Sequence, residues 1–180
     1  TIEDYDAVAR LQLLSFPEMK PWREEQWEKI VTTFPEGQIG VFLNDQLAAS
    51  SSSLLLNFDE FSSSHSWLQI TGNGTLSTHN PLGDTLYGIE IMVSPEARGM
   101  KLARRLYEAR KKLAIQNNYK RIVVGGRLPN YHFVAEKMSV KEYVQQVIDK
   151  KLFDPVLTTQ LANEFKLKRI IKDYLPGDKE

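Results

Sequence analysis

Residues 91–106 read IMVSPEARGMKLARRL. An apolar strand here runs into Pro95, then into a short turn around Gly99, and then into a long amphipathic helix that begins near Leu102. The first N–H groups of such a helix have no intrahelical acceptor and lie at the positive end of the helix dipole. The small side chains of Gly99 and Ala103 would let a ligand approach the backbone closely. The stretch therefore predicts an anion site of the kind that holds a pyrophosphate.

The charge distribution supports an anion site at this place. The 180 residues carry 23 Lys or Arg and 23 Asp or Glu, so the formal net charge is zero. Residues 98–127 nevertheless hold ten basic residues and one acid, Glu108, which gives a local charge of +9. A solvated helix face is the ordinary explanation for a charge run. The position of this run beside the expected turn favours the phosphate interpretation.

The composition excludes several classes of protein. With 42% hydrophobic and 26% charged residues, the chain is typical of a folded globular protein. Its balanced charge argues against a nucleic-acid-binding protein, and its lack of cysteine rules out a disulfide scaffold or thiol catalysis. His65, His79 and His132 have no ligand spacing, so we expect no metal site. No apolar run approaches the roughly 18 residues of a membrane helix, and we expect a cytoplasmic protein that binds no membrane.

Apolar periodicity predicts one α/β domain over residues 1–180, with helices packed on a mixed central sheet. The expected helices cover residues 1–16, 23–34, 102–118, 139–150 and 155–163. The expected strands cover residues 39–43, 47–56, 67–71, 86–93, 121–124 and 165–174. Asn44 and Asp45 are expected to form a hairpin turn, and Ser139 with Glu142 a capping box. Because the chain starts at Thr1 without Met, we expect a fragment of a longer polypeptide.

The run from Val93 through Pro95 and Arg98 to Ala103 resembles motif A of the GNAT superfamily of N-acyltransferases. In that family, backbone amides after such a strand hold the pyrophosphate of acetyl-CoA. Lys101 takes the place of the usual second glycine, where it would either add a cation near the phosphates or obstruct the loop. The resemblance implies that coenzyme A is bound by these residues: Met92, Val93, Arg98, Gly99, Met100, Lys101, Leu102, Ala103 and Arg104.

The same resemblance implies a GNAT-like fold with three layers and acetyl transfer from acetyl-CoA to a primary amine by direct attack. The acceptor would be a small molecule or a peptide. Residues 1–4 resemble the start of the family's first helix, which implies that the family's first strand is missing here. More narrowly, residues 70–75, 83–88, 125–131 and 154–158 resemble the GNAT domain of bacterial proteins fused to a carbon–nitrogen hydrolase. That likeness implies an attached hydrolase domain after residue 180, and it leaves the oligomeric state open.

Glu90 is the candidate general base, because a carboxylate among Ile and Met residues on the central strand invites a raised pKa. Strand alternation puts Ile89, Ile91 and Val93 on one face, toward the long helix, and Glu90 on the other. Glu90 would then either line an open cleft or point to solvent.

The general acid is unassigned, because Gln160 stands where the family usually has Tyr. Trp22 and Tyr87 are the candidate substrate-binding residues, against the alternative that both pack in the core.

A second hypothesis belongs to a different class. It is a non-catalytic GNAT-like module that binds coenzyme A or nothing, and that regulates or docks to an attached hydrolase. Lys101 and the missing Tyr favour this module, whereas Glu90 and the intact strand–turn–helix favour the enzyme. An RNA-binding face over residues 98–127 would need stacking aromatic side chains, and only Tyr107 and Tyr119 are available there.

Overall fold

The computed structural model describes residues 1–61 and 64–175. The helices are α1 (Tyr5–Ser15), α2 (Glu24–Thr33), α3 (Trp67–Thr71), α4 (Leu102–Gln116), α5 (Val140–Ile148) and α6 (Pro155–Ala162). The strands are β1 (Ile39–Leu43), β2 (Gln46–Leu56), β3 (Thr85–Val93) and β4 (Arg121–Val124). The chain divides into two compact units: the first holds residues 1–124 and the segment that starts at Asp173, and the second holds residues 125–172.

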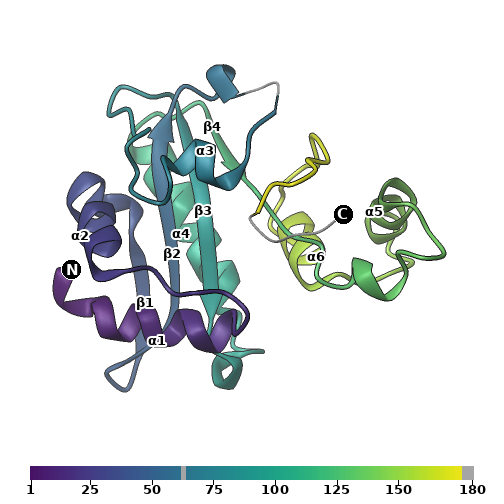
Figure 1. Cartoon of the computed structure of the whole chain (residues 1–180), viewed down its shortest axis with the longest axis horizontal. Coiled ribbons are helices and arrows are strands. Elements are labelled where there is room, and N and C mark those ends of the chain that lie inside the picture. Colours follow the sequence, from purple (N-terminus) through teal and green to yellow (C-terminus); the bar gives the residue numbers. More distant parts are fainter. Residues whose placement is uncertain (62–63, 176–180) are drawn as a thin grey trace. The chain divides into compact units, whose positions relative to one another are not determined.

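The first unit is built on an open sheet with the strand order β1-β2-β3-β4 (Figure 1). β1, β2 and β3 are antiparallel neighbours, and β3 and β4 are parallel, so the mixed sheet expected from the sequence is confirmed. One face packs on α1 and α2 through a cluster that includes Leu11 and Ile30. The other face packs on α4 through a cluster that includes Leu102 and Leu106. These two apolar clusters make the three-layer arrangement of helix, sheet and helix.

The hairpin between β1 and β2 forms where the sequence predicts it. Asn44 and Asp45 have φ angles of 49° and 62°, the left-handed conformation that a two-residue hairpin turn requires. Asn and Asp tolerate this conformation better than most residues, which explains why the turn forms at this place.

Two of the expected strands are wrong. Residues 67–71 form the short helix α3, because Ser66 accepts a hydrogen bond from the Gln69 N–H and begins a capped turn. Gly72 then ends that helix in the left-handed conformation, with φ of 58°. Residues 165–174 form no strand in the described chain. Glu164 and Asp173 have positive φ angles, so the backbone leaves the extended conformation near both ends of this segment.

The second unit consists of α5, α6 and a short 3₁₀ turn at Tyr131–Phe133 around a small apolar core. Asp154 is fully buried and begins α6 by accepting hydrogen bonds from the N–H groups of Val156 and Leu157. The hydroxyl of Tyr143 also donates to this carboxylate, at 2.9 Å. The capping box between Ser139 and Glu142 at the start of α5 is confirmed. This unit therefore owes its order to buried polar contacts as well as to apolar packing.

Candidate functional site

The turn before α4 has an open backbone. Gly99 has φ of 85°, and a Cβ atom added there would meet no atom within 4 Å. Lys101, the N-cap residue of α4, adopts the left-handed conformation with φ of 59° and ψ of 26°. That conformation is favourable for glycine and strained for lysine, so the lysine side chain at this position carries a cost in backbone strain.

The first turn of α4 carries unpaired N–H groups. Hydrogen bonding along the helix begins with the Arg105 N–H, which donates to the Lys101 carbonyl at 3.2 Å. No side chain caps this end in the described chain. The preceding N–H groups of Leu102, Ala103 and Arg104 are therefore free to receive an anion, and the residues fit a pyrophosphate.

The cations of residues 98–127 do not all serve this turn. Arg110 is buried, Arg104 pairs with Glu108 at 2.9 Å, and Lys120 pairs with Asp84 at 3.0 Å. Besides the paired Arg104, three exposed basic side chains lie at the turn or in the first helical residues: Arg98, Lys101 and Arg105. The positive charge available to an anion at the turn thus comes mainly from these three.

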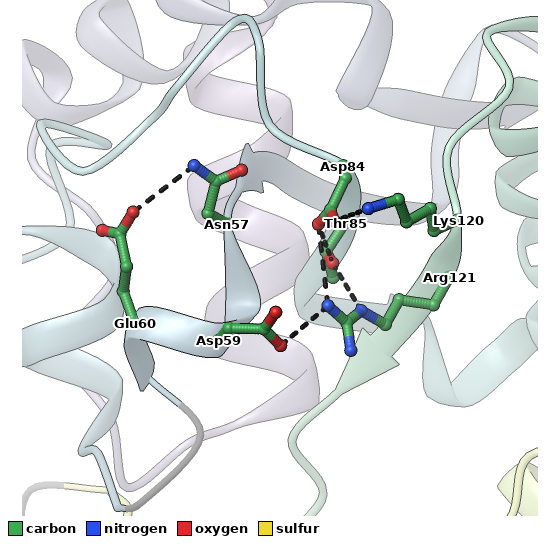
Figure 2. Close-up of polar contacts among 7 residues, drawn as sticks. All are labelled: Asn57, Asp59, Glu60, Asp84, Thr85, Lys120 and Arg121. Atoms are coloured by element: carbon green, nitrogen blue, oxygen red, sulfur yellow. Dashed lines mark hydrogen bonds and ion pairs between the residues drawn. The ribbon is translucent and has the colours of Figure 1, made fainter.

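The pairing of β3 with β4 is fixed at one end and open at the other. It runs only from Thr85 opposite Arg121 to Gly88 opposite Val124. Figure 2 shows the fixed end, where Arg121 donates to Asp59 and to the Thr85 hydroxyl, each at 2.9 Å.

Beyond Gly88, no described strand pairs with the β4-side edge of residues 89–93. An extended ligand therefore has main-chain groups to pair with along this edge.

A β-bulge interrupts β3 at the centre of the sheet. Ser52 of β2 lies opposite Glu90 and Ser53 lies opposite Gly88, so Ile89 is the extra residue. Because of this insertion the side-chain alternation shifts, and Ile89 packs in the cluster under α1 and α2. Ile91 and Val93 pack against α4 as expected. The prediction that Ile89 shares their face is therefore wrong.

Glu90 lies on the same face as α1. The Gln12 side-chain amide donates from Nε2 to Oε2 of Glu90 at 3.0 Å. The other oxygen of Glu90, Oε1, is buried and has no hydrogen-bond partner in the described chain. Burial raises the pKa of Glu90 to about 8, while the Gln12 hydrogen bond and the charge of Arg110 act to lower it. A carboxyl with this pKa exchanges its proton near neutral pH, as a general base must.

The sequence shows Arg110 only as one of the ten basic residues of the segment 98–127, and it did not predict a specific role for this residue. Its guanidinium reaches the bulge from α4, where it donates to the Ser52 carbonyl at 2.6 Å, the Ser53 hydroxyl at 3.0 Å and the Glu90 carbonyl. A Cβ atom at Gly88 would lie 2.6 Å from its Nη1 atom, so a side chain there would displace the guanidinium. The recognisable signal was a basic residue one turn after Leu106 on the apolar side of α4.

The remaining predicted residues lie in the core. The side chain of Met92 is 1% exposed, so this residue offers a ligand only its backbone. Trp22 is buried and stacks on Trp27 with ring centroids 5.9 Å apart. Tyr87 is also buried, and its hydroxyl bonds to His65 and Tyr174. A substrate-binding role for Trp22 and Tyr87 stays a prediction.

Gln160 lies in the second unit, where its side-chain amide packs against Gly126. Within the described residues, no three His, Cys, Asp or Glu side chains gather into a group that could hold a metal ion. None of the helices in this part of the chain is long and apolar enough to span a bilayer.

Comparison with known proteins agrees with this geometry. The model of the family described as "Acetyltransferase (GNAT) family" matches residues 7–135. The chain is 48% identical over 176 residues to the "Probable hydrolase YhcX" of Bacillus subtilis (strain 168), which covers 98% of this chain and 34% of that protein. It is 34% identical over 184 residues to the "Uncharacterized N-acetyltransferase YkwB" of the same organism, which covers 100% of this chain and 81% of that protein. The chain thus spans about a third of the length of YhcX.

Two solved structures share the fold over nearly the whole chain. The loading GNATL domain of CurA from Lyngbya majuscula superposes with a TM-score of 0.86 at 21% identity, covering 99% of this chain and 87% of that one. The GphF GNAT-like decarboxylase in complex with isobutyryl-CoA superposes with a TM-score of 0.75 at 19% identity, covering 99% of this chain and 89% of that one. At these identities the likeness shows the fold alone.

Proposed function

Since the chain belongs to the acetyltransferase (GNAT) family, we propose that it is an acyl-CoA-dependent N-acyltransferase that transfers an acetyl group to a primary amine. The observation that carries this proposal is the environment of Glu90. Its Oε1 atom is buried and unpaired, and its pKa is raised to about 8. It lies on the strand whose edge is open beyond Gly88, and that strand leads directly into the turn before α4.

The turn before α4 would hold the pyrophosphate of coenzyme A. The N–H groups of Leu102, Ala103 and Arg104 donate to its oxygens, and the side chains of Arg98 and Lys101 add positive charge. The main chain of Val93 would pair with the extended pantetheine arm along the open edge of β3. Acetyl-CoA supplies an activated thioester as the acyl donor.

Glu90 accepts a proton at Oε1 from the ammonium group of the acceptor, and because Oε1 is buried the proton reaches it through a water molecule. Deprotonation frees the nitrogen lone pair for direct attack. A general acid is not required, because a thiol has a pKa low enough for its thiolate to leave at neutral pH. This agrees with the presence of Gln160, which cannot donate a titratable proton, at the position where the family usually has Tyr.

Calorimetric titration with acetyl-CoA and with desulfo-CoA, in a series of salt concentrations, tests the cofactor site. We expect micromolar affinity that weakens as salt rises, because phosphate contacts are ionic. Ala103→Asp places a carboxylate in the first turn of α4 and should abolish binding. Undiminished binding by this variant would remove the turn from the proposal.

Turnover is then measured as thiol release from acetyl-CoA in the presence of a polyamine, an aminoglycoside, free amino acids or a short peptide. Glu90→Gln should abolish transfer while it leaves the affinity for acetyl-CoA nearly unchanged. A malonyl-CoA sample is included because one relative in fold is a GNAT-like decarboxylase. Release of CO₂ without acyl transfer to any amine would contradict the proposed reaction.

A second candidate function is a non-catalytic module that docks to or regulates an attached carbon–nitrogen hydrolase. The left-handed Lys101 at the usual glycine position favours it, as does the 48% identity to a protein named as a probable hydrolase. Absence of any binding to acetyl-CoA would decide for this module. With either function we propose a cytoplasmic location.

A further inference from the structure

Gln12 is a buried polar residue on the apolar face of α1. Its side chain is 3% exposed and lies four residues after Val8, in the stripe that packs on the sheet. Both ends of its amide are used. Oε1 accepts a hydrogen bond from the main-chain N–H of Trp22 at 2.9 Å, and Nε2 donates to Glu90 at 3.0 Å. A buried amide with two such partners has a fixed position.

The orientation of this amide follows from its partners. The N–H of Trp22 can only donate, so the oxygen of Gln12 must face it. The NH₂ group must then face Glu90, and an NH₂ group can only donate. The Oε2 atom of Glu90 is therefore held as an acceptor in both protonation states. When Glu90 is protonated, its proton lies on Oε1, the atom without a partner.

The other groups around Glu90 leave this assignment intact. Arg110 of α4 provides the nearby positive charge, but it donates to the Glu90 main-chain carbonyl. Ser52 of β2 lies opposite Glu90 in the sheet. Trp67 of α3 donates from its indole Nε1 to the Ile89 carbonyl at 3.3 Å. Among the described residues, the hydrogen bond to the carboxylate itself comes from Gln12.

We propose that Gln12 is a positioning residue for acyl transfer, whose amide holds Oε2 of Glu90 so that the proton taken from the amine is carried on Oε1. The inference rests on the proposed function, because it assumes that Glu90 is the base. Through the Trp22 N–H, Gln12 also ties the base to the segment between α1 and α2. Gln12 acts through Glu90 and touches no substrate atom.

The direct test is a carbon-13 NMR titration of the side-chain carboxyl of Glu90 in the protein labelled at glutamate, without any substrate. The Glu90 signal is assigned by its loss in Glu90→Gln. Gln12→Met removes both hydrogen bonds of the amide. Gln12→Glu keeps an acceptor for the Trp22 N–H and puts a second carboxyl against Glu90. Gln116→Met, at an exposed glutamine at the end of α4, is the matched control.

We expect Gln12→Met to raise the pKa of Glu90 by about one unit or more, because the ionised form loses a charge-assisted hydrogen bond. In Gln12→Glu the two carboxyls should titrate as a coupled pair, with the upper step higher still. At pH 7 both variants should lose turnover of acetyl-CoA by about tenfold or more in kcat with little change in KM, since a one-unit shift lowers the ionised fraction about tenfold. The turnover of the Gln12→Met variant should recover as pH rises, because more of Glu90 is then ionised.

An unchanged Glu90 titration in a folded Gln12→Glu protein would overturn the inference. A higher KM with unchanged kcat would overturn it as well. Should Gln12→Met fail to fold, Gln12→Glu decides, because it keeps the contact to Trp22. The two proposals fail in different ways. Full turnover by Glu90→Gln would remove Glu90 as the base, and with it the role of Gln12 in transfer, whatever the titration shows.

Discussion

The guanidinium of Arg110 donates a hydrogen bond to the main-chain carbonyl of Glu90. Arg110 comes from α4 on one face of the sheet, whereas the Glu90 side chain meets α1 on the other face. The same guanidinium donates to the Ser52 carbonyl at 2.6 Å, on the neighbouring strand. A buried cation therefore supplies donors to the backbone where the bulge disrupts the ladder between β2 and β3, and it fixes the place from which the candidate base projects.

Arg110→Met should lower the free energy of unfolding by about 3 kcal/mol, because it removes the hydrogen bonds that the buried guanidinium donates to the Ser52 and Glu90 carbonyls. Urea unfolding followed by circular dichroism measures the change. Arg105→Met, at an exposed position on the same helix, is the control and should lose less than about 0.5 kcal/mol. Equal losses in the two variants would mean that Arg110 contributes packing rather than hydrogen bonds at the bulge.

Local chemistry explains which parts of the fold could be predicted. The strand, turn and helix over residues 91–106 and the hairpin at Asn44 and Asp45 are set by residues close in sequence. The bulge at Ile89 is different, because nothing in β3 alone shows that β2 pairs with it out of register. The helix α3 was mistaken for a strand because five residues are too few for apolar periodicity to decide, and the caps at Ser66 and Gly72 decide instead.

The sequence predicted the candidate base and the candidate anion-binding turn, but it did not predict the residues that hold the base in position. Glu90 and the turn at Gly99 follow from residue type and local pattern. Gln12 and Arg110 each stand as a polar residue in an apolar helical stripe, and a sequence shows such a residue without showing what it reaches. Their partners are 78 and 20 residues away in the chain, so only the packed sheet brings them together.

The rate of acetyl transfer should rise with pH and level off above about pH 8. Burial raises the pKa of Glu90 to about 8, and a base works only in its ionised form, so activity is lost as pH falls below this value. The measurement is kcat/KM for acetyl-CoA between pH 6 and 9.5 at saturating amine. A profile that is flat over this range, or that falls as pH rises, would contradict the role of Glu90.

The free energy of unfolding should fall as pH rises, whereas the rate of acetyl transfer should rise. The folded protein keeps the Glu90 proton up to a pKa of about 8, whereas the unfolded chain releases it near the ordinary value of 4.5. Between these values the folded state binds more protons, so its free energy of unfolding falls as pH rises and levels off above about 8.

Urea unfolding at pH 5, 6, 7 and 8 tests this, and Glu90→Gln should remove the decline. His79 changes stability in the other direction, because desolvation lowers its pKa. It acts equally in both proteins, so the difference between them isolates Glu90. Parallel pH curves for the two proteins would show that Glu90 titrates normally.

Lys101 separates backbone strain from charge at the turn before α4. Lys101→Gly relieves the left-handed conformation, whereas Lys101→Ala keeps it, and both remove the cation. We expect the glycine variant to be more stable than the alanine variant by about 1 kcal/mol in urea unfolding. Both should bind acetyl-CoA several-fold more weakly than the parent chain, with a shallower dependence on salt, because one ionic contact is lost. Tighter binding by both variants would mean instead that the lysine side chain obstructs the turn. That result would favour the docking module over the enzyme.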